Sequence, residues 1–174
     1  MEELKYPIGK FHFEKEFTPE NRQGWIADIE QLPGQLREAV KGFTAAQLET
    51  PYRPGGWTLR QVVHHLADSH VHSYIRFRFG LTEQEPTIKP YDEARWAELA
   101  DAKSAPLELS LAMLEGILGR WVALTKTMSP ADFSRVLLHP ERGQLSLGQL
   151  LNLYSWHSRH HLAHITGLRR RSGW

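Results

Sequence analysis

One long stretch decides the fold: residues 58–79 have the sequence TLRQVVHHLADSHVHSYIRFRF. It opens with a capping box, in which the Thr58 hydroxyl and the Gln61 amide satisfy backbone groups that a helix start leaves free. The residues just before it, Pro54-Gly55-Gly56, are strong helix breakers. We therefore predict a long helix from Thr58 to about Phe79.

The same capping form recurs near the C-terminus, at Ser146-Leu147-Gly148-Gln149. It predicts a second long helix, which continues to about Arg171 and stops before Gly173. Three arginines end this helix, where positive charge complements the helix dipole. We assign them that structural role rather than an anion site.

Two further helices complete the set. Thr18 offers a cap hydroxyl and Pro19 a preset first turn for a helix to Val40, which Pro33-Gly34 should kink or interrupt. Ser104 and Pro106 mark the start of the other. Its apolar residues recur at helical spacing, and they are Leu107, Leu111, Leu114, Leu118, Trp121, Leu124 and Met128.

The remaining segments carry weaker signals. Residues 1–17 show no sustained period and are expected to form an extended arm, and residues 44–48 a short turn. Residues 81–105 contain prolines and predict a long connection with at most one short helix, around Glu93–Leu99. Residues 136–143 predict an irregular or hairpin-like excursion.

Four helices of roughly 20 residues with no alternating strand pattern predict an all-α four-helix bundle. The connection at 81–105 is long enough to traverse the bundle, so the helices that it joins can run parallel. This favours an up-down-down-up order. A chain of 174 residues fits one domain, spanning residues 1–174.

Composition narrows the function. Lys and Arg number 21 against 20 for Asp and Glu, so no charge surplus is available for nucleic acid or an anionic membrane surface. No stretch approaches the ~20 apolar residues of a membrane span, and the start lacks a signal-peptide pattern, so we expect a cytoplasmic protein. The chain has no cysteine, which excludes disulfides, thiol nucleophiles and cysteine metal sites.

Histidine is therefore the side chain expected to bind any transition metal, and the chain has ten histidines. Two clusters lie on predicted helices, at residues 64–72 and 157–164. His157 and His161 are four residues apart, one turn along the same helix face, a spacing suited to two ligands of one metal ion. His160 and His164 form a second such pair, and the spacing alone does not choose between them.

The alternative is that these histidines are hydrogen-bonded polar groups or solvated surface. Several imidazoles near a bundle core without partners would be costly, and a shared metal ion removes that cost by using their lone pairs. Of the adjacent His64 and His65, only one can face the core centrally, since successive helical residues are separated by about 100°.

Several motifs closely resemble the YfiT-type branch of the DinB-like superfamily, over nearly the whole chain. The resemblance implies a four-helix bundle of up-down-down-up topology, a homodimer, and one metal ion held by three histidines. The motifs are Tyr6-Pro7-Ile8-Gly9, Pro51-Tyr52-Arg53, Gly55-Gly56-Trp57-Thr58, Arg60–His70, Trp156-His157-Ser158 and His160-His161.

The resemblance also implies which histidines bind the metal. In the family pattern one ligand precedes Leu in a His-Leu motif, here His65, and the other two fall on His157 and His161. His164 stands where many relatives carry glutamine, which makes it a candidate to line the pocket or support a ligand. Asp68, three residues past His65, is a weaker candidate to orient an imidazole or act as a base.

Three neutral imidazoles leave an open position on Zn²⁺ or Ni²⁺, as in catalytic sites. We therefore expect a metal-dependent hydrolase that uses metal-bound water as nucleophile on a small-molecule substrate. Motifs of zinc proteases, serine hydrolases and nucleotide-binding loops are absent from the sequence. Two alternatives stay open: a metal-dependent thiol S-transferase of the bacillithiol type, and a non-catalytic metal-binding stress protein.

Overall fold

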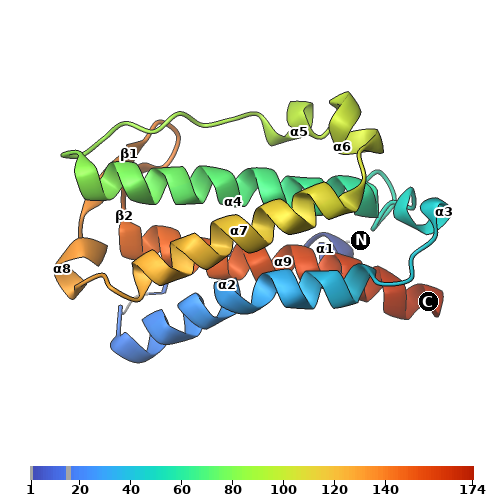
Figure 1. The fold of residues 1–174 in the computed structure, drawn as a ribbon, viewed down its shortest axis with the longest axis horizontal. Coiled ribbons are helices and arrows are strands. Elements are labelled where there is room, and N and C mark those ends of the chain that lie inside the picture. The colour runs from blue at the N-terminus through green and yellow to red at the C-terminus, as the bar shows by residue number, and fades with distance from the viewer. Residues whose placement is uncertain (1, 15–16) are drawn as a thin grey trace.

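Four long helices form the bundle in the computed structural model of the chain, which describes residues 2–14 and 17–174 (Figure 1). They are α2 (Pro19–Val40), α4 (Leu59–Thr82), α7 (Leu107–Thr125) and α9 (Leu147–Ser172). In Figure 1, α2 and α9 run in one direction and α4 and α7 in the other, so the order is up-down-down-up. Each long helix packs on two others, α2 and α4 both lying between α7 and α9. The predicted fold class is confirmed.

The capping boxes define where the helices begin. The Thr58 hydroxyl accepts a hydrogen bond from the backbone N–H of Gln61, whose side chain accepts one from the N–H of Thr58 at 2.9 Å. Ser146 and Gln149 repeat the pattern at the start of α9. These two helices therefore start at fixed residues, which sets the register of the side chains between them.

The expected interruption at Pro33-Gly34 does not occur, because α2 continues through both residues. A proline inside a helix removes one backbone hydrogen bond. Leu32 and Leu36, which flank it, are fully buried against the core, and tertiary packing of this kind supplies most of a helix's stability.

The expectation of an extended arm over residues 1–17 is wrong for Glu2–Lys5, which form one helical turn, α1. Local hydrogen bonding explains the difference, since the Tyr6 N–H donates to the Glu2 carbonyl oxygen at 2.9 Å. Farther along, the Glu14 N–H donates to the Asn152 side chain of α9. Residues 1, 15 and 16 of the predicted arm lie outside the described residues.

The connections between the long helices carry short elements. The segment from α4 to α7 runs along the length of α4 in Figure 1. Residues 136–143 contribute to an antiparallel hairpin. Two backbone hydrogen bonds tie it to that segment, from the Ile88 N–H to the Leu138 carbonyl oxygen and from the Leu138 N–H to the Pro86 carbonyl oxygen. The short elements are α3 (Ala45–Leu48), α5 (Glu93–Trp96), α6 (Ala100–Ser104), α8 (Pro130–Phe133), β1 (Val136–His139) and β2 (Gly143–Ser146).

A single apolar cluster joins all four long helices. Its fully buried members include Ile29, Leu36, Leu66, Phe77, Trp121 and Leu151. Along the contact between α4 and α9, however, histidines replace part of this apolar packing. Within the described residues, none of the helices has the length and apolar character that crossing a membrane requires.

Candidate metal site

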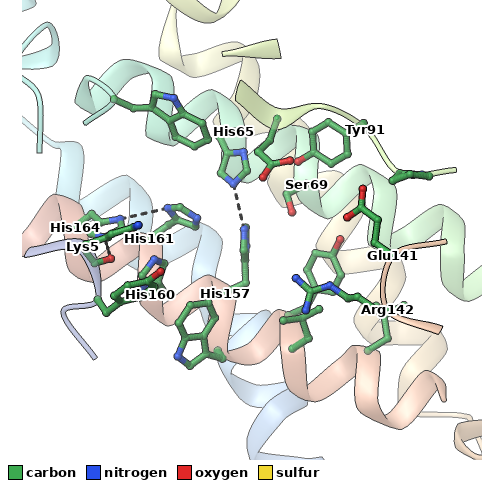
Figure 2. A pocket seen from close by; sticks show the side chains of 18 of the residues that line it. Lys5, His65, Ser69, Tyr91, Glu141, Arg142, His157, His160, His161 and His164 are labelled. Carbon is green, nitrogen blue, oxygen red and sulfur yellow. Dashed lines mark hydrogen bonds between the residues drawn. The ribbon is translucent and has the colours of Figure 1, made fainter. Parts of the chain in front are cut away.

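Three histidines converge between α4 and α9 (Figure 2). His65 comes from α4, and His157 and His161 come from successive turns of α9. The Nε2 atoms of His65 and His157 lie 3.1 Å apart, and the ring of His161 lies 4.7 Å from that of His65. One ring nitrogen from each of the three falls within 4.8 Å of the others.

The adjacent histidines on α4 are separated by the helix geometry. His65 faces α9, whereas His64 contacts the Ser110 hydroxyl of α7 through Nδ1 at 2.7 Å and the Ala105 carbonyl oxygen through Nε2. His64 is therefore a hydrogen-bonded buried group with both nitrogens occupied. On α9 the four-residue spacing places the rings of His157 and His161 4.5 Å apart.

Burial keeps these histidines uncharged. It lowers the pKa of His65 to about 3, with nearby histidines adding to the effect. The pKa values of His157 and His161 are held well below the ordinary value, first by burial and then by the neighbouring imidazoles. Neutral imidazoles keep a lone pair for a cation.

The donor geometry fits a small divalent ion. Nitrogens bound tetrahedrally at the Zn–N distance of about 2.0–2.1 Å are about 3.3 Å apart. The 3.1 Å between the Nε2 atoms of His65 and His157 is close to that spacing. The three residues could therefore hold a metal ion with little rearrangement.

A second, overlapping group consists of His160, His161 and His164, whose ring nitrogens also lie within 4.8 Å of one another. His164 has contacts at both nitrogens, with Nε2 3.2 Å from the Lys5 carbonyl oxygen and Nδ1 3.4 Å from Nδ1 of His161. A carbonyl oxygen only accepts, so Nε2 of His164 carries the proton and Nδ1 carries the lone pair.

It follows that Nδ1–H of His161 donates to His164, which leaves Nε2 of His161 with a free lone pair. His164 thus fixes the orientation and tautomer of His161, and Tyr52 stacks on His164 with ring centroids 3.9 Å apart. This arrangement favours the group of His65, His157 and His161 as the metal site, with His164 as its support.

The structure does not bring Asp68 to these histidines. The three-residue spacing from His65 leaves it about 60° away around the helix, and it does not line the cavity that His65 lines. Burial and the charge of Asp101 raise its pKa to about 6. Asp68 therefore belongs to the side of α4 that faces α6.

A cavity of about 530 Å³ opens beside the three histidines. Most of its wall could not be predicted from the sequence. Tyr91 lies in the long connection and Arg142 in the hairpin, and apolar residues have no regular spacing in either segment. The spacing of residues on α4 could have indicated one wall residue, Arg76. Arg76 follows His65 by eleven residues, three turns plus about 20°, which places it on the same helix face. The rest of the wall includes Ser69, Arg76, Tyr91, Glu93, Glu141, Arg142 and Tyr154, of which Tyr154 has its ring 5.8 Å from that of His157.

Comparison with known proteins identifies the family. Residues 28–165 match the sequence profile of the DinB superfamily. The chain belongs to this superfamily. YfiT from Bacillus subtilis, another four-helix bundle, is 50% identical in sequence, with a TM-score of 0.95 and 99% of each chain covered. Its structure is described as that of "a probable metal-dependent hydrolase with an unusual four-helix bundle topology".

Other relatives extend this result. Proteins from Bacillus mycoides strain KBAB4 and Bacillus cereus strain 03BB102 are each 51% identical over 174 residues, with both chains fully covered. Both are named "Putative metal-dependent hydrolase". TT2238, a four-helix bundle protein, has 20% identity and a TM-score of 0.58 over 84% of this chain and 98% of its own, which shows the shared fold alone. The family resemblance of the sequence is confirmed.

The first prediction concerns the support of His161 by His164. A glutamine at position 164 can donate from its amide N–H to the Lys5 carbonyl and accept from His161, whereas leucine can do neither. We expect His164→Leu to weaken Zn²⁺ binding by roughly 10–100-fold and His164→Gln by far less. Competition with a chromophoric chelator measures both. Equal losses in the two variants would instead indicate that His164 itself binds the metal.

The second prediction concerns pH. Histidines of the unfolded chain bind protons near pH 6.5, whereas folded His65 stays neutral until about pH 3. The unfolded state therefore binds more protons between pH 7 and 5, and stability falls as the pH is lowered. The pKa of Asp68, raised to about 6, has the opposite effect on stability. This single carboxyl group is outnumbered by the buried histidines.

We expect the free energy of unfolding of chelated protein to fall by more than about 1.4 kcal/mol per pH unit below pH 6, equivalent to more than one proton. Denaturant titrations at pH 7, 6 and 5 measure this slope. A stability that does not change over this range would show that the histidines are not buried in neutral form.

Proposed function

We propose that this protein is a metal-dependent hydrolase of a small-molecule substrate, with one divalent ion, Zn²⁺ or Ni²⁺, bound by His65, His157 and His161. One observation carries the proposal: three neutral imidazoles from two helices converge at the wall of a cavity. The names of the close relatives support it. On the family resemblance alone, we extend the proposal to a homodimer.

Among the residues that the structure describes, the group at this point consists of three neutral imidazoles. These residues would hold a divalent ion with an open position, and the ion would there polarise a carbonyl group and lower the pKa of a water molecule to about 7. The cavity volume of about 530 Å³ is in the usual range for small-molecule sites.

The surrounding side chains position the ligands. The indole of Trp57 packs against the imidazole of His65 with ring centroids 4.8 Å apart. His164 and the Lys5 carbonyl hold His161 from the opposite side. Such contacts fix the ring orientation of a metal ligand before the ion binds, which raises its affinity.

The third prediction tests the ligand set. Replacing His65, His157 or His161 by Ala should each reduce metal content from one ion per chain to a small fraction, because two imidazoles hold a divalent ion much less tightly than three. His160→Ala is the matched control on α9, since His160 stacks on Trp156 and lies outside the proposed set. Metal analysis after gel filtration gives the stoichiometry. Loss of metal in His160→Ala with retention in His65→Ala would assign the ion to the other histidine group.

The fourth prediction tests the reaction. The metal-loaded protein should hydrolyse at least one member of a panel of activated esters, amides and lactams without added thiol, and His157→Ala should abolish this activity. Product analysis separates the alternatives. Formation of a thiol conjugate, with no water-derived product, would establish a thiol transferase instead. Absence of any turnover, combined with loss of helix content on chelation, would favour a structural metal protein.

A further inference from the structure

Arg76 lies in the cavity wall, eleven residues along α4 from His65, and is the buried side chain among the Arg, Lys and Glu residues of the described chain that line the cavity. Only 8% of its surface is exposed. Its Nη1 donates to the Tyr154 hydroxyl at 3.3 Å and its Nη2 to the Lys89 carbonyl oxygen at 3.5 Å, while its buried Nε has no hydrogen-bond partner. Both contacts are long, and a guanidinium has five N–H donors.

No carboxylate neutralises this charge within the part of the chain that the structure describes, residues 2–14 and 17–174. The eight ion pairs found there do not include Arg76. The two acidic residues of the same cavity wall, Glu93 and Glu141, are exposed and therefore hydrated. Burying a cation without a counter-charge is costly, so a bound anion would relieve a cost that the free protein bears.

A second cation lies at the same end of the cavity. Figure 2 shows Arg142, on the hairpin, across the cavity from His161 and His164. Burial lowers the pKa of His139, the charges of Arg76 and Arg142 lower it further, and the charge of Glu141 raises it. Arg142 is exposed, as Glu141 is, so the buried charge at this end is that of Arg76. The hydroxyls of Ser69, Tyr91 and Tyr154 line the same cavity and add further donors.

We propose that Arg76 binds an oxyanion group of the substrate, a carboxylate or a phosphate, while the bond to be hydrolysed lies at the three histidines. The planar fork of arginine suits both groups through paired N–H bonds. This assignment rests on the proposed function for the reacting end, but the anion site itself does not. It defines the substrate as an anion with a hydrolysable group some distance from the charge.

The helix geometry sets that distance. The backbones of His65 and Arg76 are separated by about 16 Å along α4, since each residue rises about 1.5 Å. Side chains of a helix lean toward its N-terminus, which brings the guanidinium back toward the histidines. Tyr154, which Arg76 contacts, precedes His157 by one turn of α9. An extended substrate of several bonds can therefore reach from Arg76 to the histidines.

Binding to the metal-free full-length chain tests the anion site without the reaction. The probes are glutarate, inorganic phosphate and uncharged dimethyl glutarate, measured by calorimetry and thermal shift. We expect at least one anion to bind, dimethyl glutarate not to bind, and Arg76→Met to weaken anion binding by at least 10-fold. Arg78→Met is the matched control, because Arg78 is exposed on the same helix and packs on Tyr74. Tighter binding of glutarate or of phosphate identifies the oxyanion.

Arg76→Met should fold, since it removes a buried charge without a counter-charge, and its unfolding midpoint without ligand should equal or exceed that of the wild type. If it does not fold, Arg76→Lys serves instead, because it keeps the charge but loses the paired geometry and should also weaken binding. Anion binding that is absent from the wild type, or unchanged in the folded Arg76 variant, would overturn the proposal.

Hydrolysis assays on the metal-loaded protein test the anion site at Arg76 independently of the proposed hydrolase activity. The substrates are 4-nitrophenyl hydrogen glutarate and its uncharged methyl ester. We expect Arg76→Met to reduce kcat/KM for the acid by at least 10-fold and to leave the methyl ester unchanged. Arg76-dependent anion binding without hydrolysis would contradict the hydrolase alone. Hydrolysis of both esters, with no effect of Arg76→Met, would contradict the anion site alone.

Discussion

Burial of uncharged imidazoles between α4 and α9 is the constraint on which the rest of the structure depends. Charged histidines could not occupy this contact without separating the helices, so burial and mutual repulsion hold the pKa values of His65, His157 and His161 low. The two capping boxes fix the starts of both helices and thus the register in which the rings meet. A neutral, converging set of nitrogens is the result, and it is the state that a cation requires.

The segments outside the long helices complete the site. The Lys5 carbonyl at the end of α1 orients His164 and, through it, His161. The long connection brings Tyr91 to the cavity, and the hairpin brings Arg142. The up-down-down-up order makes this possible, because the connection must run the length of α4 to start α7 at the same end. The long connection therefore both sets the up-down-down-up order and supplies Tyr91 to the cavity wall.

The fold could be predicted further from the sequence than the site could. Capping boxes and apolar spacing are local signals, and they placed the four long helices with errors of a few residues at their ends. The interruption predicted at Pro33 does not occur, because tertiary packing outweighs the loss of one backbone hydrogen bond. The roles of His64 and His164 depend on Ser110 and Lys5, which are distant in sequence, so spacing could not reveal them. The ligand set stays a prediction from the family resemblance that the observed convergence supports.

Positive charge affects both ends of the proposed site in the same way. Three neutral imidazoles contribute no negative charge to offset a divalent ion, and the buried guanidinium of Arg76 has no carboxylate partner within the described chain. Cations in one cavity repel each other, and an anion between them reduces this repulsion. An anionic substrate would therefore reduce the electrostatic cost at both ends, whereas an uncharged one would reduce neither. The net charge of the whole chain, +1, conceals this local excess, because most of its charged groups are paired or hydrated at the surface.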